Sequence, residues 1–116
     1  IQSVYNFAKK TNPKVISLKN DQSVIAKYKK FHYSVWPQVK KDLISSGVKN
    51  MKIFIFESTL FMYMEASDNF DFSLLANASD ETREWNKIMN NLQVPVSTVR
   101  PGEWWHQLEK VYDLEW

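Results

Sequence analysis

Cysteine is absent from the 116 residues, and glycine and histidine occur only twice each. Without cysteine the chain has no disulfide, no thiol nucleophile and no cysteine-ligated zinc. Gly47 and Gly102 are too few to form a glycine-rich loop for a nucleotide phosphate. Two histidines without an HExxH spacing also provide few candidate ligands for a metal ion. We therefore expect no metal and no other cofactor.

The chain also lacks a long apolar run and a strong excess of charge of one sign. No apolar stretch approaches the roughly 20 residues of a membrane-spanning helix. Fifteen basic and thirteen acidic residues are interleaved and leave a net charge of +2, so no basic face for a phosphate backbone is expected. Neither a membrane nor a nucleic acid is an expected partner. We expect a cytoplasmic protein. Because the first residue is Ile1 and not Met, export after signal cleavage is the alternative.

Aromatic residues are abundant, since seven Phe, five Tyr and five Trp make up 15% of the chain. Apolar residues make up 44% and charged residues 24%, which is typical of a globular protein. The length fits a single domain. We expect that domain over residues 14–116, after an N-terminal extension over residues 1–13 with weak periodicity.

The first half of the domain predicts a strand, a helix and a hairpin. The strand is expected at residues 15–18, and the helix over 22–45, with a kink near Val35 and Trp36 caused by Pro37. Two further strands, at 51–56 and 60–65, are separated by a short hairpin connection.

The second half predicts helix and then strand. A short helical stretch is expected at residues 70–76, and a longer helix around Trp85 follows it. A loop at 94–103 leads to a last strand at 107–114.

The main elements thus follow the order strand, helix, strand, strand, helix, strand. This order is typical of the ferredoxin-like βαββαβ fold, an α+β fold in which helices cover one face of an antiparallel sheet. The aromatic content would leave an unusually large apolar patch on the bare face. We therefore expect a homodimer that buries sheet against sheet.

His32 lies four residues after Tyr28 on the apolar face of the first helix. A buried imidazole needs a hydrogen-bond partner, and its ordinary pKa of about 6.5 suits proton transfer near neutrality. The residues alone leave two interpretations open: a satisfied core histidine, or a general acid/base with Tyr28 beside it. The other histidine, His106, lies near the last strand.

Other candidates are aromatic or acidic. Rings with polar edges can fill a core or line a pocket, and they suit the apolar faces of sugars. Trp85, Trp104 and Trp105 are candidates of this kind. Glu65 and Glu109 face the core or the solvent, depending on the strand register.

The segment from Tyr28 to Pro37 carries the pattern Y-x-x-x-H-x-x-x-W-P, which resembles the signature of the L-rhamnose mutarotase family. Residues 84–86 and 101–112 also fall where family members have comparable segments. The resemblance covers about residues 14–114.

This resemblance implies a dimeric α+β barrel that interconverts the α and β anomers of a 6-deoxy-L-hexose without a cofactor. His32 matches the family's catalytic proton donor, and Tyr28 matches a sugar-binding tyrosine. Trp85 matches the first residue of a tandem tryptophan pair in the bacterial rhamnose enzyme. Asn86 replaces the second tryptophan, and Met51 stands where that enzyme has a sugar-contacting tyrosine.

We therefore expect an isomerase of carbohydrate metabolism that acts on a monosaccharide, L-rhamnose first and L-fucose second. In the expected mechanism His32 protonates the ring oxygen, while Tyr28, Glu65 or Glu109 orients or deprotonates the anomeric hydroxyl. Trp104 and Trp105 would add aromatic surface to the pocket. A cofactor-free monooxygenase and a non-catalytic sugar-binding module are alternatives on the same fold.

Overall fold

The computed structural model describes residues 10–11, 13–70, 75, 78–96 and 104–116. Most of the helical stretch expected at 70–76 and of the loop expected at 94–103 lies outside these residues. The strands are β1 (Lys10–Thr11), β2 (Lys14–Leu18), β3 (Val48–Phe56), β4 (Thr59–Ala66), β5 (Gln93–Val94) and β6 (His106–Gln107). The helices are α2 (Gln22–Tyr33), α3 (Pro37–Ser45) and α5 (Asp80–Leu92).

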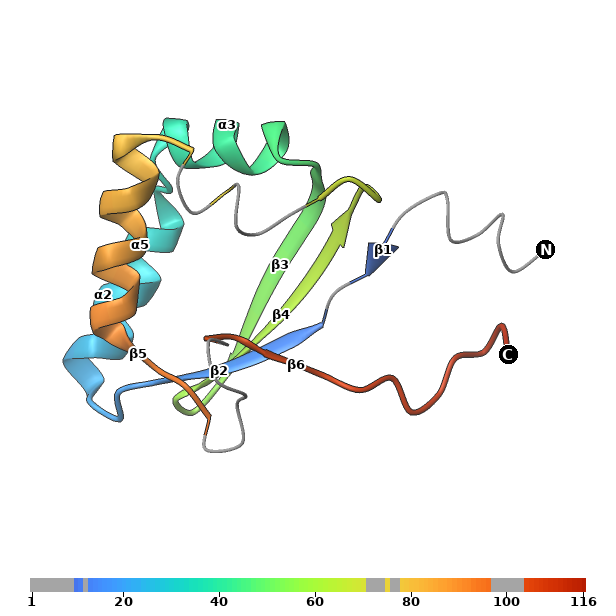
Figure 1. Cartoon of the computed structure of the whole chain (residues 1–116). Helices are drawn as coiled ribbons and strands as arrows, with labels where there is room; N and C mark the ends of the chain where they lie inside the picture. Colours follow the sequence, from blue (N-terminus) through green and yellow to red (C-terminus); the bar gives the residue numbers. More distant parts are fainter. Residues whose placement is uncertain (1–9, 12, 71–74, 76–77, 97–103) are drawn as a thin grey trace.

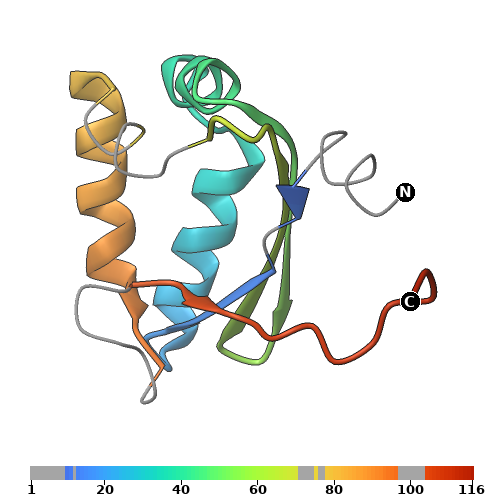
Figure 2. The same ribbon diagram turned by 45° about the vertical axis from the view of Figure 1, so that its right-hand side comes forward.

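All strands belong to one antiparallel sheet, and the three helices cover one of its faces (Figures 1 and 2). β4 pairs with β3 on one side and with β1 and β2 on the other. β5 and β6 pair with the far edge of β2. The resulting order β3, β4, β2, β6 is that of the ferredoxin-like fold, so the expected α+β class is confirmed. None of the described helices has the length and apolar character needed to cross a membrane.

The segment before Pro13 contributes to the sheet. Lys10 and Thr11 pair with Ala66 and Glu65 at the end of β4. The last residues of the expected extension therefore extend the sheet by a short strand, while the division of the chain at residue 13 stays a prediction.

The expected continuous helix over 22–45 is wrong, because the structure has two helices. Asp21 caps α2 by accepting a hydrogen bond from the Ser23 amide at 2.8 Å. The helix ends at Tyr33, four residues before Pro37, whose ring crowds that carbonyl and supplies no N–H. Trp36 takes an extended ψ of 133° before the proline, and Pro37 starts α3. Proline thus breaks the helix where a kink was expected.

The hairpin is confirmed, and β3 and β4 are longer than expected. The connection is Glu57 and Ser58, one residue shorter than expected, because Thr59 already pairs with Phe56. Glu57 has a φ of 56°, the left-handed conformation that tight hairpin turns require.

The last strand is shorter than the expected 107–114. β6 pairs with β2 only at His106 and Gln107, and the Leu108 amide then donates to the Pro13 carbonyl at 2.9 Å. Pro13 has no N–H to return a hydrogen bond, so the ladder cannot continue past it.

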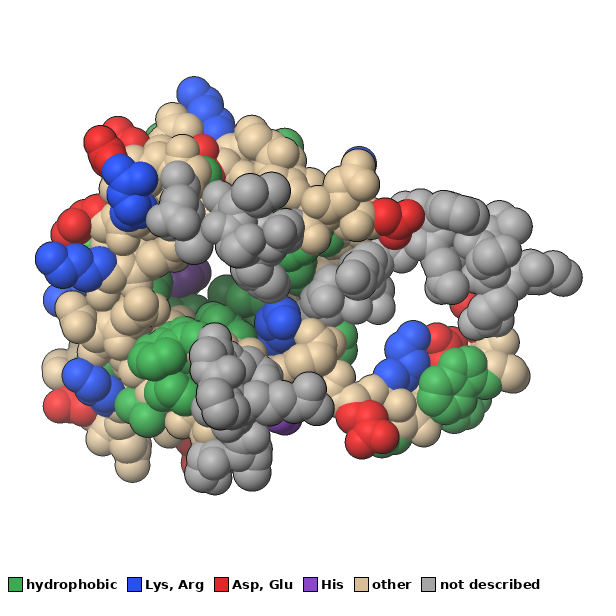
Figure 3. Space-filling view, viewed as in Figure 1, with side chains coloured by type: hydrophobic (Ala, Val, Ile, Leu, Met, Phe, Trp, Pro, Cys, Tyr) green, Lys and Arg blue, Asp and Glu red, His purple; other side chains and the backbone are tan. Residues whose placement is uncertain are grey.

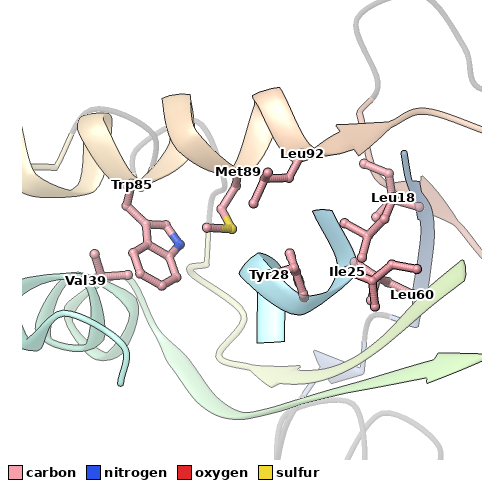
Figure 4. Packing of buried hydrophobic residues seen from close by; sticks show 9 residues of the cluster. Leu18, Ile25, Tyr28, Val39, Leu60, Trp85, Met89 and Leu92 are labelled. Carbon is pink, nitrogen blue, oxygen red and sulfur yellow. The ribbon is translucent and has the colours of Figure 1, made fainter. Parts of the chain in front are cut away.

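Side chains of β4 alternate between the two faces of the sheet. Leu60, Met62, Met64 and Ala66 are buried on the face that the helices cover. The intervening residues point to the other face, which no described helix covers (Figure 2). Between the covered face and the helices lies the core, in which side chains from α2, α3 and α5 meet those of β2 and β4 (Figure 4).

Candidate active site

A cavity of about 250 Å³ lies between the sheet and the helices. Its lining comes from α2, α3, α5, β3, β4 and the segment at residues 104–105. The face drawn in Figure 3 is hollowed beside α5, and hydrophobic side chains border part of the hollow. Seven predicted site residues line the cavity: Tyr28, His32, Met51, Trp85, Asn86, Trp104 and Trp105. The sequence pattern thus identifies residues that the fold brings together.

Glu65 and Glu109 are not brought to the cavity. Glu65 alternates with the buried Met64 and Ala66, so it points to the opposite face of the sheet. Glu109 is exposed in the segment after β6, beyond the end of the sheet ladder. The expectation that one of these carboxylates assists His32 therefore has no support in the fold.

His32 is held by the helix that carries it. Its Nδ1 lies 2.9 Å from the Tyr28 carbonyl oxygen. A carbonyl oxygen only accepts, so Nδ1 carries the proton and Nε2 of the neutral ring is a hydrogen-bond acceptor. Burial lowers the pKa of His32 below its ordinary 6.5, and the Tyr28 carbonyl opposes that shift. At neutral pH the ring is therefore an uncharged base.

Two rings fix the His32 imidazole in place. It stacks on Tyr28 with ring centroids 4.0 Å apart, and it packs against Trp85 in T-shaped geometry with centroids 5.3 Å apart. Trp85 also packs in T-shaped geometry against Trp36 at 5.3 Å and Phe31 at 5.7 Å. Figure 4 shows the indole of Trp85 reaching from α5 toward Val39 of α3. One side of the cavity is therefore an aromatic wall built around Trp85.

Tyr28 lines the same cavity, although only 4% of the residue is exposed. Burial raises the pKa of its phenol well above the ordinary range, against a hydrogen bond with the Gln93 side chain that lowers it. The phenol thus stays protonated. Gln93 in turn accepts a hydrogen bond from the Trp104 indole Nε1 at 2.8 Å.

A buried carboxylate sets the position of α5. Asp42 on α3 accepts hydrogen bonds from Gln38 at 2.9 Å, from Ser79 at 2.5 Å and from Thr82 at 2.5 Å. Ser79 is also the N-cap of α5. These hydrogen bonds hold the pKa of Asp42 below its ordinary value. Because Thr82 lines the cavity, the clamp fixes the helix that carries Trp85 and Asn86.

Several polar lining residues were missed from the sequence. Thr82, Asn90 and Gln93 line the cavity together with Asn86. Thr82, Asn86 and Asn90 lie four residues apart along one face of α5, and Gln93 follows three residues later, just after the helix ends. The signal was therefore present: polar side chains share a helix face with Trp85, where an ordinary core would be apolar.

The site combines apolar walls with a few polar tips and one uncharged imidazole. Such a cavity suits a small molecule that has an apolar face and several hydroxyl groups. His32 is the lining residue whose ordinary pKa lies nearest neutrality. In the described part of the chain, no three His, Asp or Glu side chains lie close enough together to hold a metal ion. Fold and site thus define a small α+β domain with a cavity of apolar walls, a few polar side chains and an imidazole.

Comparison with known proteins defines the family. Residues 13–114 match the model of the L-rhamnose mutarotase family. The chain belongs to this family.

Individual relatives carry different names. A UPF0734 protein of Dictyostelium discoideum is 38% identical over 92% of this chain and 91% of its own. An L-fucose mutarotase of Xanthomonas campestris is 29% identical over 86% of this chain and 84% of its own. The crystal structure of an L-rhamnose mutarotase from Formosa agariphila superposes with a TM-score of 0.67 at 26% identity, covering 91% of this chain and 99% of that one.

Proposed function

We propose that this protein is a mutarotase that interconverts the α and β anomers of a 6-deoxy-L-hexose. The observation that carries the proposal is the uncharged His32 ring, fixed through Nδ1 and lining a cavity whose other walls are aromatic, apolar and amide side chains. Anomer exchange needs one proton moved from the anomeric hydroxyl to the ring oxygen, and a single imidazole can move it.

The proposed mechanism starts with His32 as a base. Its Nε2 accepts the proton of the anomeric hydroxyl while the bond from C1 to the ring oxygen breaks and C1 becomes a carbonyl carbon. The electron pair of that bond stays on the ring oxygen, which then takes the proton from His32. Rotation about the C1–C2 bond and the reverse sequence give the other anomer. Neither a redox change nor a second substrate is involved.

The cavity supports a deoxy sugar as the substrate. The Trp85 wall offers an apolar surface to a pyranose face. Met51, Met62 and Met89 also line the cavity, and their flexible thioether side chains suit a methyl group at C6. Asn86 and Asn90 can hydrogen-bond sugar hydroxyls from the side of α5.

L-rhamnose is the first candidate substrate, and L-fucose is the second. The family model and the Formosa agariphila structure are named for L-rhamnose. The relative named for L-fucose aligns over 86% of this chain, whereas a Listeria monocytogenes relative named for L-rhamnose aligns over 53%. Because the relative named for L-fucose aligns over more of this chain, we propose L-fucose as the second candidate.

Saturation-transfer NMR tests the proposal. One anomeric proton is saturated, and the loss of intensity at the other is followed with and without protein, for L-rhamnose and L-fucose in parallel. We expect faster exchange for at least one sugar. Binding without faster exchange would instead identify a sugar-binding module, and unchanged exchange without binding would refute the proposal.

We also propose that the chain forms a homodimer in the cytoplasm. The face of the sheet away from the helices carries Phe54, Phe56 and Phe61 with 59%, 69% and 39% of their surfaces exposed. Apolar side chains so exposed on adjacent strands favour burial against a second copy. Light scattering on the eluted protein should give twice the 13.7 kDa chain mass.

A further inference from the structure

Polar and apolar side chains line different sides of the cavity. Among the described lining residues, every polar side chain comes from α2, from α5 or from the chain after α5, and His32, Asn86 and Asn90 are of this kind. The elements α3, β3 and β4 supply only apolar side chains. The cavity therefore has one wall that can hydrogen-bond a ligand and one that offers it apolar contact.

The register of the hairpin explains the apolar wall. Ile53 of β3 pairs with Met62 of β4, and Met51 pairs with Met64. Met62 and Met64 are buried on the face of the sheet that the helices cover. Met51 and Ile53 point to the same face, because the side chains of directly paired residues lie on one face of a sheet. Met51, Ile53 and Met62 all line the cavity, and we call these three residues the strand floor.

The surroundings of the strand floor are apolar as well. Met51, Ile53 and Leu43 of α3 pack against the core cluster that contains Met62, and Leu43 also lines the cavity. A ligand hydroxyl placed against the strand floor would meet methyl and methylene groups and thioether sulfurs, which are at most weak acceptors. It would therefore give up its hydrogen bonds with water without an equivalent replacement.

A 6-deoxy-hexose in its pyranose form is divided in the same way. Its ring oxygen lies between C1, which carries the anomeric hydroxyl, and C5, which carries the methyl group. The hydroxyls on C2, C3 and C4 lie along the remaining edge of the ring. When the anomeric hydroxyl meets His32 and the other hydroxyls face the amides of α5, the methyl group is the part left for the strand floor.

We propose that the strand floor holds the C6 methyl group, and that Met51 is a specificity-determining residue that selects 6-deoxy sugars against their 6-hydroxy counterparts. This inference rests on the proposed mutarotase function. A hydroxymethyl group in the same place would bury a hydroxyl without a good partner. Apolar pockets discriminate against a substrate with one extra hydroxyl by about 100-fold, and we expect a preference of that size.

Two pairs of sugars that differ only at C6 test the selection in the wild type. L-Rhamnose is paired with L-mannose, and L-fucose with L-galactose. Saturation-transfer NMR gives kcat/KM for each of the four sugars. In the pair that contains the better substrate, we expect kcat/KM to be about 100-fold higher for the 6-deoxy member.

Met51→Gln tests the assignment to the strand floor. Glutamine keeps the length and the unbranched shape of methionine, and its amide can donate to and accept from a C6 hydroxyl. We expect the ratio of kcat/KM between the two members of a pair to fall about tenfold. Ile53→Thr is a second variant, since threonine is β-branched and suits a strand. Its hydroxyl should lower the same ratio about threefold.

Two control variants separate selection at C6 from a general loss of activity. Asn86→Ala removes an amide from the polar wall, which faces hydroxyls that both members of a pair share. Both kcat/KM values should fall, and their ratio should stay within about twofold of the wild type. Lys52→Gln introduces the same side chain one residue along β3, at an exposed position on the outer face. Both values and their ratio should stay within about twofold of the wild type.

The outcomes distinguish the inference from the function on which it rests. Equal kcat/KM for both members of each pair in the wild type overturns the inference and leaves the mutarotase function standing. A wild-type ratio that is retained in folded Met51→Gln and Ile53→Thr also overturns it, as does an equal fall of the ratio in Asn86→Ala. Absence of exchange with all four sugars in the wild type overturns the proposed function, and the inference with it.

Discussion

The two faces of the sheet use the same strands for different purposes. On the covered face, Met62 and Met51 line a cavity closed by helices. On the outer face, which carries Phe54, Phe56 and Phe61, no described helix packs. Both faces carry apolar side chains, so the strands alone do not make one of them a site.

The chemistry of the covered face comes from the elements around the strands. Tyr28 and His32 come from α2, Asn86 from α5, and Gln93 and Trp104 from the chain after that helix. The strands supply an apolar floor, and the helices and connections add the polar tips. We therefore expect substitutions on the two faces to have separable effects on exchange and on assembly.

Trp85→Ala should produce the largest effect, because it breaks the covered face itself. Trp85 is 6% exposed and contacts the rings of Phe31, His32 and Trp36. Its truncation should lower the free energy of unfolding by about 3–5 kcal/mol and remove one wall of the cavity. Urea denaturation measures the loss, and a change below about 1 kcal/mol would show that the aromatic wall is not part of the core.

Acidification should lower exchange through His32. Burial holds the pKa of His32 below 6.5, so the base is uncharged at pH 7 and gains a proton only as the pH falls below that value. We expect kcat/KM to be level from pH 7 to 8, then to fall about tenfold per pH unit below the His32 pKa. A rise in kcat/KM toward acid pH would mean that the imidazolium is the active form.

The same shift links His32 to stability. Its folded-state pKa is lowered, so the unfolded chain binds the proton first as the pH falls below 6.5. The contribution of the uncharged ring to stability is therefore complete above pH 6.5 and is lost between that pH and the lower folded-state pKa. Thermal melts of the wild type should show this loss, and those of His32→Ala should not.

Phe54→Lys should act on assembly and leave exchange almost unchanged. Phe54 pairs with Phe61 across the outer face and is 59% exposed. A charge at this position cannot be buried against a second copy without a partner, so the population should shift toward monomer. Light scattering follows the mass. Loss of exchange in a folded monomer would mean that the cavity depends on the outer face.

Glu65→Gln should have the smallest effect. Glu65 points to the outer face, away from the cavity. We expect exchange within about twofold of the wild type, the range of an ordinary surface substitution. A loss comparable with that of a catalytic group would restore the carboxylate to the mechanism.

Local signals in the sequence predicted most elements, because caps, proline and alternation act within a few residues. Asp21 caps α2, and the hairpin of β3 and β4 was recognised from its apolar runs. A disruption of the helix at Pro37 was predicted correctly. Its form was predicted wrongly, as a kink and not as a break between two helices, because helix propensity does not reveal how far the chain turns. Pro13 limits β6 through a contact distant in sequence, which no local pattern contains.

The same difference between local signals and contacts distant in sequence applies to the site. Tyr28 and His32 were predicted together because they share a helix face. Thr82 and Gln93 were missed because their hydrogen bonds with Asp42 and Trp104 form only in the fold.

The central claim is that His32 moves the proton that opens the sugar ring. Saturation-transfer NMR on His32→Ala and the wild type, at pH 7 and equal concentration, tests it most directly. We predict that the variant remains folded and exchanges the anomers of L-rhamnose or L-fucose about 10²- to 10⁴-fold more slowly than the wild type. A folded variant that exchanges the sugar as fast as the wild type would contradict the claim.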